Sequence, residues 1–148
     1  TIDINASFLL KDSSGNIVGV KSADESAIAP QQEIVLYSLD DVDFVDFDYK
    51  VSTEKSRYSS VFNEATITDN MAENKVIVSA TNNGNKELDY LKASVLYFPN
   101  GSPVYVKDRY LTGNNNALMP GSTEYAELEA YTTFDSYKVF ITGRCSKY

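Results

Sequence analysis

Apolar and polar residues alternate along most of the chain with a period of two, which is the spacing of a half-buried strand rather than of a helix. Residues 75–80 are rich in β-branched side chains and carry no helical apolar stripe. In residues 91–98 every second side chain is apolar, which predicts a strand with one strongly buried face. Only residues 22–29 and 70–73 could make a helical turn.

Short polar segments that contain glycine separate these stretches. Residues 82–85 read Asn-Asn-Gly-Asn, and an Asn-Gly pair supplies the positive φ values that tight connections need. Residues 12–15 and 99–101 are predicted turns for the same reason. Several short strands joined by such turns predict an all-β fold, in the form of an antiparallel β-sandwich.

The sequence also repeats itself. A β-type stretch, a turn ending in glycine, a proline among small or polar residues and a Tyr-Lys-Val occur twice in the same order. The matching residues are about 88 positions apart, which predicts two copies of one module. The four landmark pairs are Ala6 and Ala93, Gly15 and Gly101, Pro30 and Pro120, and Tyr49 and Tyr137.

The two copies define two tandem modules, residues 1–58 and residues 59–148. In the second, the repeated region is preceded by residues 62–90, which contain two more predicted strands. The corresponding strands of the first module would precede Thr1, so this module is expected to lack its opening strands. An unpaired sheet edge and an uncovered part of the core would result. Either strands upstream in the native protein or a neighbouring chain, through self-association, would cover them.

The second module resembles the FxLYD-type domain. The resemblance rests on residues 76–84 and 91–97, the turn at Gly101 and the Leu-Met-Pro-Gly of residues 118–121. That family has a strand ending in Asn, an aromatic-rich strand ending in Tyr-Asp-x-x-Gly, and then Leu-x-Pro-Gly. Phe98 replaces the Asp of this pattern. The resemblance covers most of residues 62–142.

The first module resembles the same family more weakly, over residues 4–52. Lys11 takes the Tyr position, and Gln31 replaces the Gly that follows Pro30. The resemblance implies immunoglobulin-like sandwiches of exported, extracytoplasmic proteins and lipoproteins, mainly of Gram-positive bacteria. It implies a secreted or envelope-anchored location and brings no catalytic residues with it.

Composition narrows the function classes. The chain has 13 basic and 21 acidic residues and a net charge of −8, so the phosphate backbone of a nucleic acid should repel it. No apolar run approaches the length of a membrane-spanning helix. Histidine is absent and Cys145 is the only cysteine, which excludes His-based catalysis, Cys/His zinc sites and an intrachain disulfide. Cys145 is predicted to be an incidental thiol in a polar tail.

An acidic segment is the first candidate site. Five carboxylates within nine residues could hold Ca²⁺, although the spacing does not match an EF-hand loop. The alternative is a solvated connection in which Phe44 and Phe47 plug the core and the carboxylates face water. The candidate calcium ligands are Asp40, Asp41, Asp43, Asp46 and Asp48.

Tyrosines are the second candidate site, because the chain has eleven of them and no tryptophan. Rings on one face could stack on a glycan, whereas the alternative is that they fill the cores and rims of the sandwich. The candidates for such a platform are Tyr105, Tyr110, Tyr125 and Tyr131.

A glycosidase would need two carboxylates across a cleft, for which Glu124, Glu127 and Glu129 are the candidates. Glu127 and Glu129 share a strand face by period two and are expected to point to solvent together, which speaks against an enzyme. The sequence therefore favours a non-enzymatic binding or spacer module at the cell envelope. The expected partner is an unknown protein or glycan at the cell surface, and no cofactor is expected. The alternative is a carbohydrate-binding or calcium-dependent adhesion module.

Overall fold

The computed structural model describes residues 1–39, 41–112 and 117–145. Over these residues the chain forms strands and no α-helix, which confirms the predicted all-β class. No helix in the described part is long and apolar enough to cross a membrane. The elements are β1 (Ile2–Lys11), β2 (Ile17–Ile28), β3 (Asp46–Lys55), β4 (Ser59–Ser60), β5 (Ala65–Ala72), β6 (Lys75–Asn82), β7 (Tyr90–Phe98), η1 (Pro99–Gly101), β8 (Tyr105–Tyr110), β9 (Thr123–Glu129) and β10 (Ser136–Cys145).

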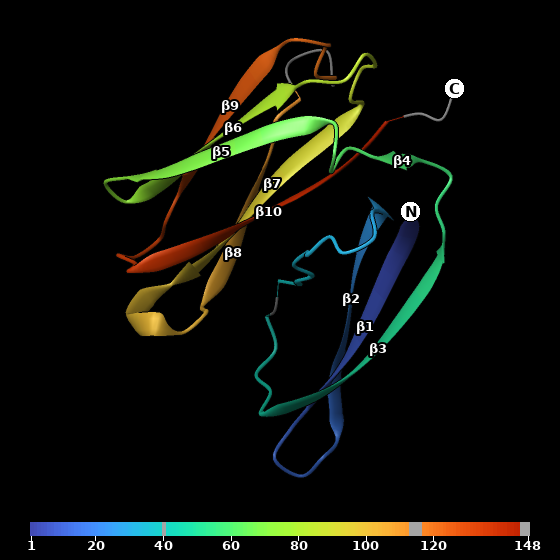
Figure 1. Cartoon of the computed structure of the whole chain (residues 1–148). Coiled ribbons are helices and arrows are strands. Elements are labelled where there is room, and N and C mark those ends of the chain that lie inside the picture. The colour runs from blue at the N-terminus through green and yellow to red at the C-terminus, as the bar shows by residue number, and fades with distance from the viewer. Residues whose placement is uncertain (40, 113–116, 146–148) are drawn as a thin grey trace.

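The strands form three antiparallel sheets (Figure 1). Sheet A has the order β2-β1-β3, sheet B the order β4-β10-β7-β8, and sheet C the order β5-β6-β9. Sheets B and C face one another in a β-sandwich-like arrangement, whereas sheet A lies beside them. The strand order β2-β1-β3 in sheet A has the same connectivity as β8-β7-β10 in sheet B.

The main apolar core lies between sheets B and C. Alternate residues of β6 and β7 point into it, as the period of two predicts. Tyr97 is fully buried there, and its hydroxyl donates a hydrogen bond of 2.6 Å to the carbonyl of Leu128 in the opposite sheet. The buried residues of this core are Val61, Val76, Val78, Ala80, Leu88, Leu91, Ala93, Val95, Tyr97, Leu111, Leu118, Ala126, Leu128 and Cys145.

Asn82 fixes the loops at one end of the sandwich. Its buried side-chain amide donates to the carbonyls of Lys86 and Leu118 at 2.8 and 2.9 Å. Its side-chain oxygen accepts from the backbone N–H of Gly84 at 2.9 Å. A buried amide that is satisfied in this way holds three chain segments together. Asn82, the last residue of β6, thus has a structural role in this chain.

Neither segment that could make a helical turn forms one. Residues 22–28 continue β2, in which Ser22 and Ala23 pair with Ser7 and Ala6 of β1. Residues 70–72 end β5, and Glu73 adopts a positive φ of 55° in the turn to β6. Both segments are short and rich in residues that tolerate helix, so the long-range hydrogen bonds of the sheets override the local preference.

The prediction of one buried face on β7 holds for its inner side and fails for its outer side. Lys92 and Ser94 point away from the core of the sandwich and are nevertheless buried. The C-terminal part of β2 lies against sheet B and brings Glu25 to Lys92. Packing of sheet A against sheet B, which strand periodicity does not contain, removes this second face from water.

Candidate functional site

The inner face of sheet A carries several apolar side chains that are exposed to water. The antiparallel register places Phe8 of β1 beside Tyr49 of β3, and Ala6 beside Val51. Phe47 pairs with Leu10, so its ring extends the same face. Alternation of side chains across a strand is the reason that these residues gather on one side.

This face is covered along β2 and uncovered along β3. On β1, which pairs with β2, the side chains of Ala6 and Leu10 are buried, whereas every residue of β3 is exposed. The rings of Phe44 and Phe47 meet edge to face at 6.5 Å and remain exposed to water. We call the set Phe8, Phe44, Phe47, Tyr49 and Val51 the open face. Its last four members expose between 42% and 69% of their surface.

A hollow of about 270 Å³ lies beside the open face and has mostly apolar walls. Phe8 and Phe47 line it from sheet A, and Leu36 and Phe44 line it from the chain between β2 and β3. The rings of Phe8 and Phe47 meet edge to face at 6.4 Å. Exposed apolar surface that continues into a hollow is typical of an interaction site.

The connecting segment, residues 33–39, runs between sheet A and sheet B (Figure 1). It is not part of a sheet, and among the described residues the backbone groups of residues 33–37 make no hydrogen bond. Side chains anchor the segment instead. Tyr37 donates a hydrogen bond of 2.6 Å to Asp108, and Glu33 pairs with Lys138. Burial and then the bond to Asp108 raise the pKa of Tyr37 well above its usual range, so its hydroxyl remains a donor.

Gln32 fixes the start of this segment through both ends of its side-chain amide. Its nitrogen donates to the carbonyl of Ile141 in β10 at 2.8 Å. Its oxygen accepts from the backbone N–H of Ala29 at 2.9 Å and from the hydroxyl of Ser60 at 3.3 Å. The segment is therefore fixed to the outer side of sheet B before it passes along sheet A.

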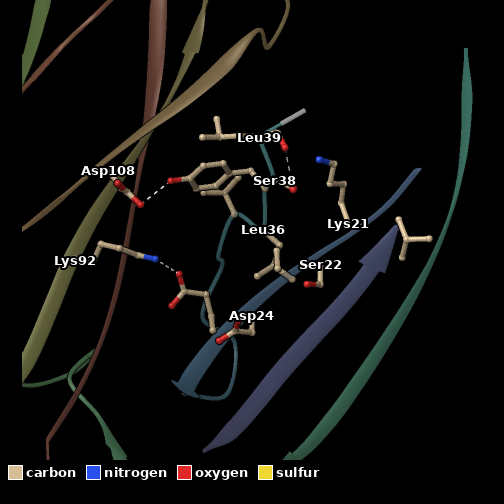
Figure 2. A pocket seen from close by; sticks show the side chains of 13 residues that line it. Lys21, Ser22, Asp24, Leu36, Ser38, Leu39, Lys92 and Asp108 are labelled. Atoms are coloured by element: carbon tan, nitrogen blue, oxygen red, sulfur yellow. Dashed lines mark hydrogen bonds and ion pairs between the residues drawn. The ribbon is translucent and has the colours of Figure 1, made fainter. Parts of the chain in front are cut away.

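A larger hollow of about 590 Å³ separates β2 and residues 35–39 from sheet B. Figure 2 shows Lys92 and Asp108 reaching into it from sheet B, and Lys21, Ser22 and Asp24 lining the opposite wall. Its deepest polar contact is the ion pair between Lys92 and Glu25, both of which are almost fully buried. Together with the hydrogen bond between Tyr37 and Asp108, this ion pair joins β2 and residues 35–39 to sheet B.

The structure separates the predicted calcium ligands. Asp41 pairs with Lys21 at 3.0 Å, and Asp48 pairs with Lys11 at 2.5 Å. The bond to Lys21 lowers the pKa of Asp41. The side chain of Asp46 accepts the backbone N–H of Phe47, and Asp43 is exposed. Asp40 lies outside the described residues. Within the described ranges, no three acidic or cysteine side chains form a group that could hold a metal.

The structure divides the predicted tyrosine platform into two pairs. Tyr105 stacks on buried Tyr97 with ring centres 4.9 Å apart, and its hydroxyl accepts the backbone N–H of Tyr131. Tyr110 and Tyr125 line a groove of about 440 Å³ between β8 and β9. Both of these rings are largely exposed. Tyr105 and Tyr131 therefore belong to the rim of the core, whereas Tyr110 and Tyr125 lie in a groove.

Glu127 and Glu129 point to solvent on one face of β9, as expected, and Glu124 lies on the other face. Glu127 pairs with Lys75 at 2.7 Å. Cys145 ends β10 and is buried, so the prediction that it lies in a polar tail is wrong. Burial raises the pKa of its thiol, which is consistent with an unreactive cysteine.

Sequence reasoning missed three residues that join β2 and the chain after it to sheet B. They are Glu25, Gln32 and Tyr37. The available signal was Lys92, a charged residue in the middle of an otherwise apolar strand. Its partner could not be found from the pattern because Glu25 lies 67 residues earlier.

Comparison with known proteins adds no identification. No protein family model matches the chain, and neither a search of curated proteins nor a search of solved structures gives a match.

Proposed function

We propose that the protein is a non-enzymatic binding protein made of two related immunoglobulin-like modules, residues 1–58 and 59–148, and that the open face is its contact surface. The repeated sequence landmarks support the two modules. So does the order β2-β1-β3, which matches β8-β7-β10 strand for strand. Under this equivalence β1 corresponds to β7, β2 to β8 and β3 to β10.

The observation that carries the proposal is the exposure of the open face. In the second module the equivalent strand is β10, whose Tyr137 and Val139 are partly buried and pack against the core between sheets B and C. In the first module β3 bears Tyr49 and Val51, which are 69% and 50% exposed. Apolar residues at positions that pack against a core in one copy and are exposed in the other favour binding over a purely architectural role.

The cellular setting is part of the proposal and rests on the FxLYD-type resemblance. We place the protein outside the cytoplasm, secreted or anchored at a bacterial envelope, with a surface protein as its partner. The absence of histidine from the sequence and the mutual pairing of the charged groups in the larger hollow support a non-enzymatic role.

Peptide selection tests the contact surface. A phage-displayed library of random peptides is selected on the immobilised chain, and each clone is then measured on Val51→Glu and on Val104→Glu. The two valines are 50% and 63% exposed, so neither substitution should unfold the chain. We expect the dominant clones to lose at least about tenfold in affinity on Val51→Glu and to bind Val104→Glu normally. Clones that bind both variants equally, or no enriched clone at all, would contradict the proposal.

Glycan binding in the groove between β8 and β9 is a second candidate, favoured by the exposed rings of Tyr110 and Tyr125 beside Arg109 and Glu127. A sugar at a hundred times its Kd should stabilise the fold by about 2.7 kcal/mol, which a thermal shift with cell-wall and host glycans detects. The shift is expected to disappear in Tyr125→Ala and to persist in Tyr131→Ala. No shift with any glycan, or a shift that survives Tyr125→Ala, would remove this candidate.

A further inference from the structure

The groove between β8 and β9 carries a cation that the described part of the chain leaves unpaired. The groove has a volume of about 440 Å³, and its two strands are the outermost strands of sheets B and C. Arg109 lines the groove and is exposed. Among the described residues its guanidinium has no hydrogen bond, ion pair or ring contact. A free guanidinium in a groove is suited to an anionic group of a ligand.

The alternation of side chains along β8 places Arg109 on the side of sheet C. Tyr105, Lys107 and Arg109 lie on one face of this strand. Tyr105 stacks on Tyr97 of the core, and the Nζ atom of Lys107 lies 3.8 Å from the ring centre of Tyr131. Lys107 thus has an aromatic partner within the chain, whereas Arg109 faces the groove without one.

The carboxylates that line the groove do not neutralise Arg109. Glu127 and Glu129 point to solvent on the outer face of β9, and Glu127 pairs with Lys75 at 2.7 Å. Asp108 lies on the face of β8 opposite Arg109, where it accepts a hydrogen bond from the connecting segment. The groove therefore presents a positive charge from β8 that an anionic ligand can reach.

Exposed tyrosine rings at the same groove suit a sugar. Tyr110 and Tyr125 line it and are 60% and 70% exposed. Tyr90 meets the ring of Tyr110 edge to face at 5.1 Å, which limits its motion before a ligand binds. Aromatic faces stack on the apolar faces of sugar rings. Along the outer edges of β8 and β9 the backbone groups have no strand partner in the described structure, so sugar hydroxyls can bind them.

We propose that the groove between β8 and β9 binds a carboxylated sugar, whose carboxylate pairs with Arg109 and whose ring stacks on Tyr125. The inference rests on the glycan candidate given above, to which it adds the class of sugar, and it is independent of the open face. A guanidinium binds the two oxygens of a carboxylate together, an interaction that a neutral sugar does not offer.

The distribution of charge along the chain is compatible with an acidic ligand at this groove. Residues 1–58 carry five basic and eleven acidic residues, whereas residues 59–148 carry eight and ten. Most of the net negative charge thus belongs to the part of the chain that does not form the groove. Screening by salt weakens repulsion from distant exposed carboxylates more than it weakens a direct contact with Arg109.

Matched acidic and neutral sugars test the inference. Tetragalacturonate, a hyaluronan tetrasaccharide and sialyllactose are each compared with their methyl esters, which lack the negative charge, by calorimetric titration of the whole chain. We expect at least one acid to bind about tenfold or more tighter than its ester. Arg109→Gln should remove this difference and leave the affinity for the ester unchanged. Arg57→Gln is the control, because it removes the same charge from an exposed arginine outside the groove.

The outcomes separate this inference from the proposed function. Equal affinity for acid and ester would overturn the carboxylate preference and leave the glycan candidate to the Tyr125→Ala test. A preference that survives Arg109→Gln, or that Arg57→Gln weakens equally, would overturn the role of Arg109. Dextran sulfate that binds as tightly as the best acid would show attraction by charge alone and overturn the site. No binding of any acid would overturn the inference, while the phage selection decides the open face independently.

Discussion

Replacing Lys92 with methionine is expected to lower the free energy of unfolding by about 3–5 kcal/mol. The side chains of Lys92 and Glu25 expose only 11% and 8% of their surface, and each is the ionic partner of the other. Methionine leaves the carboxylate of Glu25 in a site that water reaches poorly, without a compensating charge. The loss is measured by urea or guanidinium unfolding at neutral pH.

Two further variants show whether burial causes this loss. In the double variant Lys92→Met with Glu25→Leu, no charge is left buried, and we expect most of the stability to return. Lys138 pairs with Glu33 at the surface, where the two side chains are 52% and 70% exposed. Lys138→Met should therefore change the stability by less than about 1 kcal/mol. Equal small losses for Lys92→Met and Lys138→Met would show that the interface between sheets A and B does not depend on the buried pair.

Replacing Tyr97 with alanine is the second large effect, with an expected loss of about 3–5 kcal/mol. The ring is fully buried, stacks on Tyr105 and meets Phe134 edge to face at 4.8 Å. Alanine would leave a cavity between sheets B and C and would remove the hydrogen bond to Leu128, which joins them. Chemical unfolding followed by circular dichroism measures the change.

Tyr97→Phe separates the ring from its hydroxyl. It keeps the packing and leaves the carbonyl of Leu128 without its donor, so the expected loss is about 1–2 kcal/mol. Tyr110→Ala is the control, because that ring is exposed in the groove and should contribute little. If Tyr97→Ala and Tyr110→Ala had the same effect, Tyr97 would not be a central residue of the core.

The stability of the sandwich and the binding of a partner should be separable. Tyr97 lies between sheets B and C, whereas the open face belongs to sheet A. Lys92 is one of the residues that join the two regions, since it lies on β7 and pairs with Glu25 of β2. Binding measurements on variants of the open face can therefore be interpreted without loss of the main core.

Strands and turns could be predicted from the sequence because their signals are local. The β-branched run at residues 75–80 became β6, and the alternation in residues 91–98 placed Tyr97 on the buried side of β7. The turn at residues 99–101 also formed, with Asn100 and Gly101 at positive φ. These outcomes depend on side-chain alternation and on backbone preferences, which a short stretch of sequence carries.

Tertiary structure decided where the candidate site residues lie. It extended β2 through residues that could have made a helical turn, buried Lys92 on the second face of β7, and paired Asp41 and Asp48 with different lysines. Each of these outcomes depends on a partner far away in the sequence. By itself the sequence determined the class of fold and the strands that local signals mark, whereas the two modules stay a prediction. Only the packing of sheet A against sheet B decided which faces are covered, because burial depends on long-range contacts that strand periodicity does not encode.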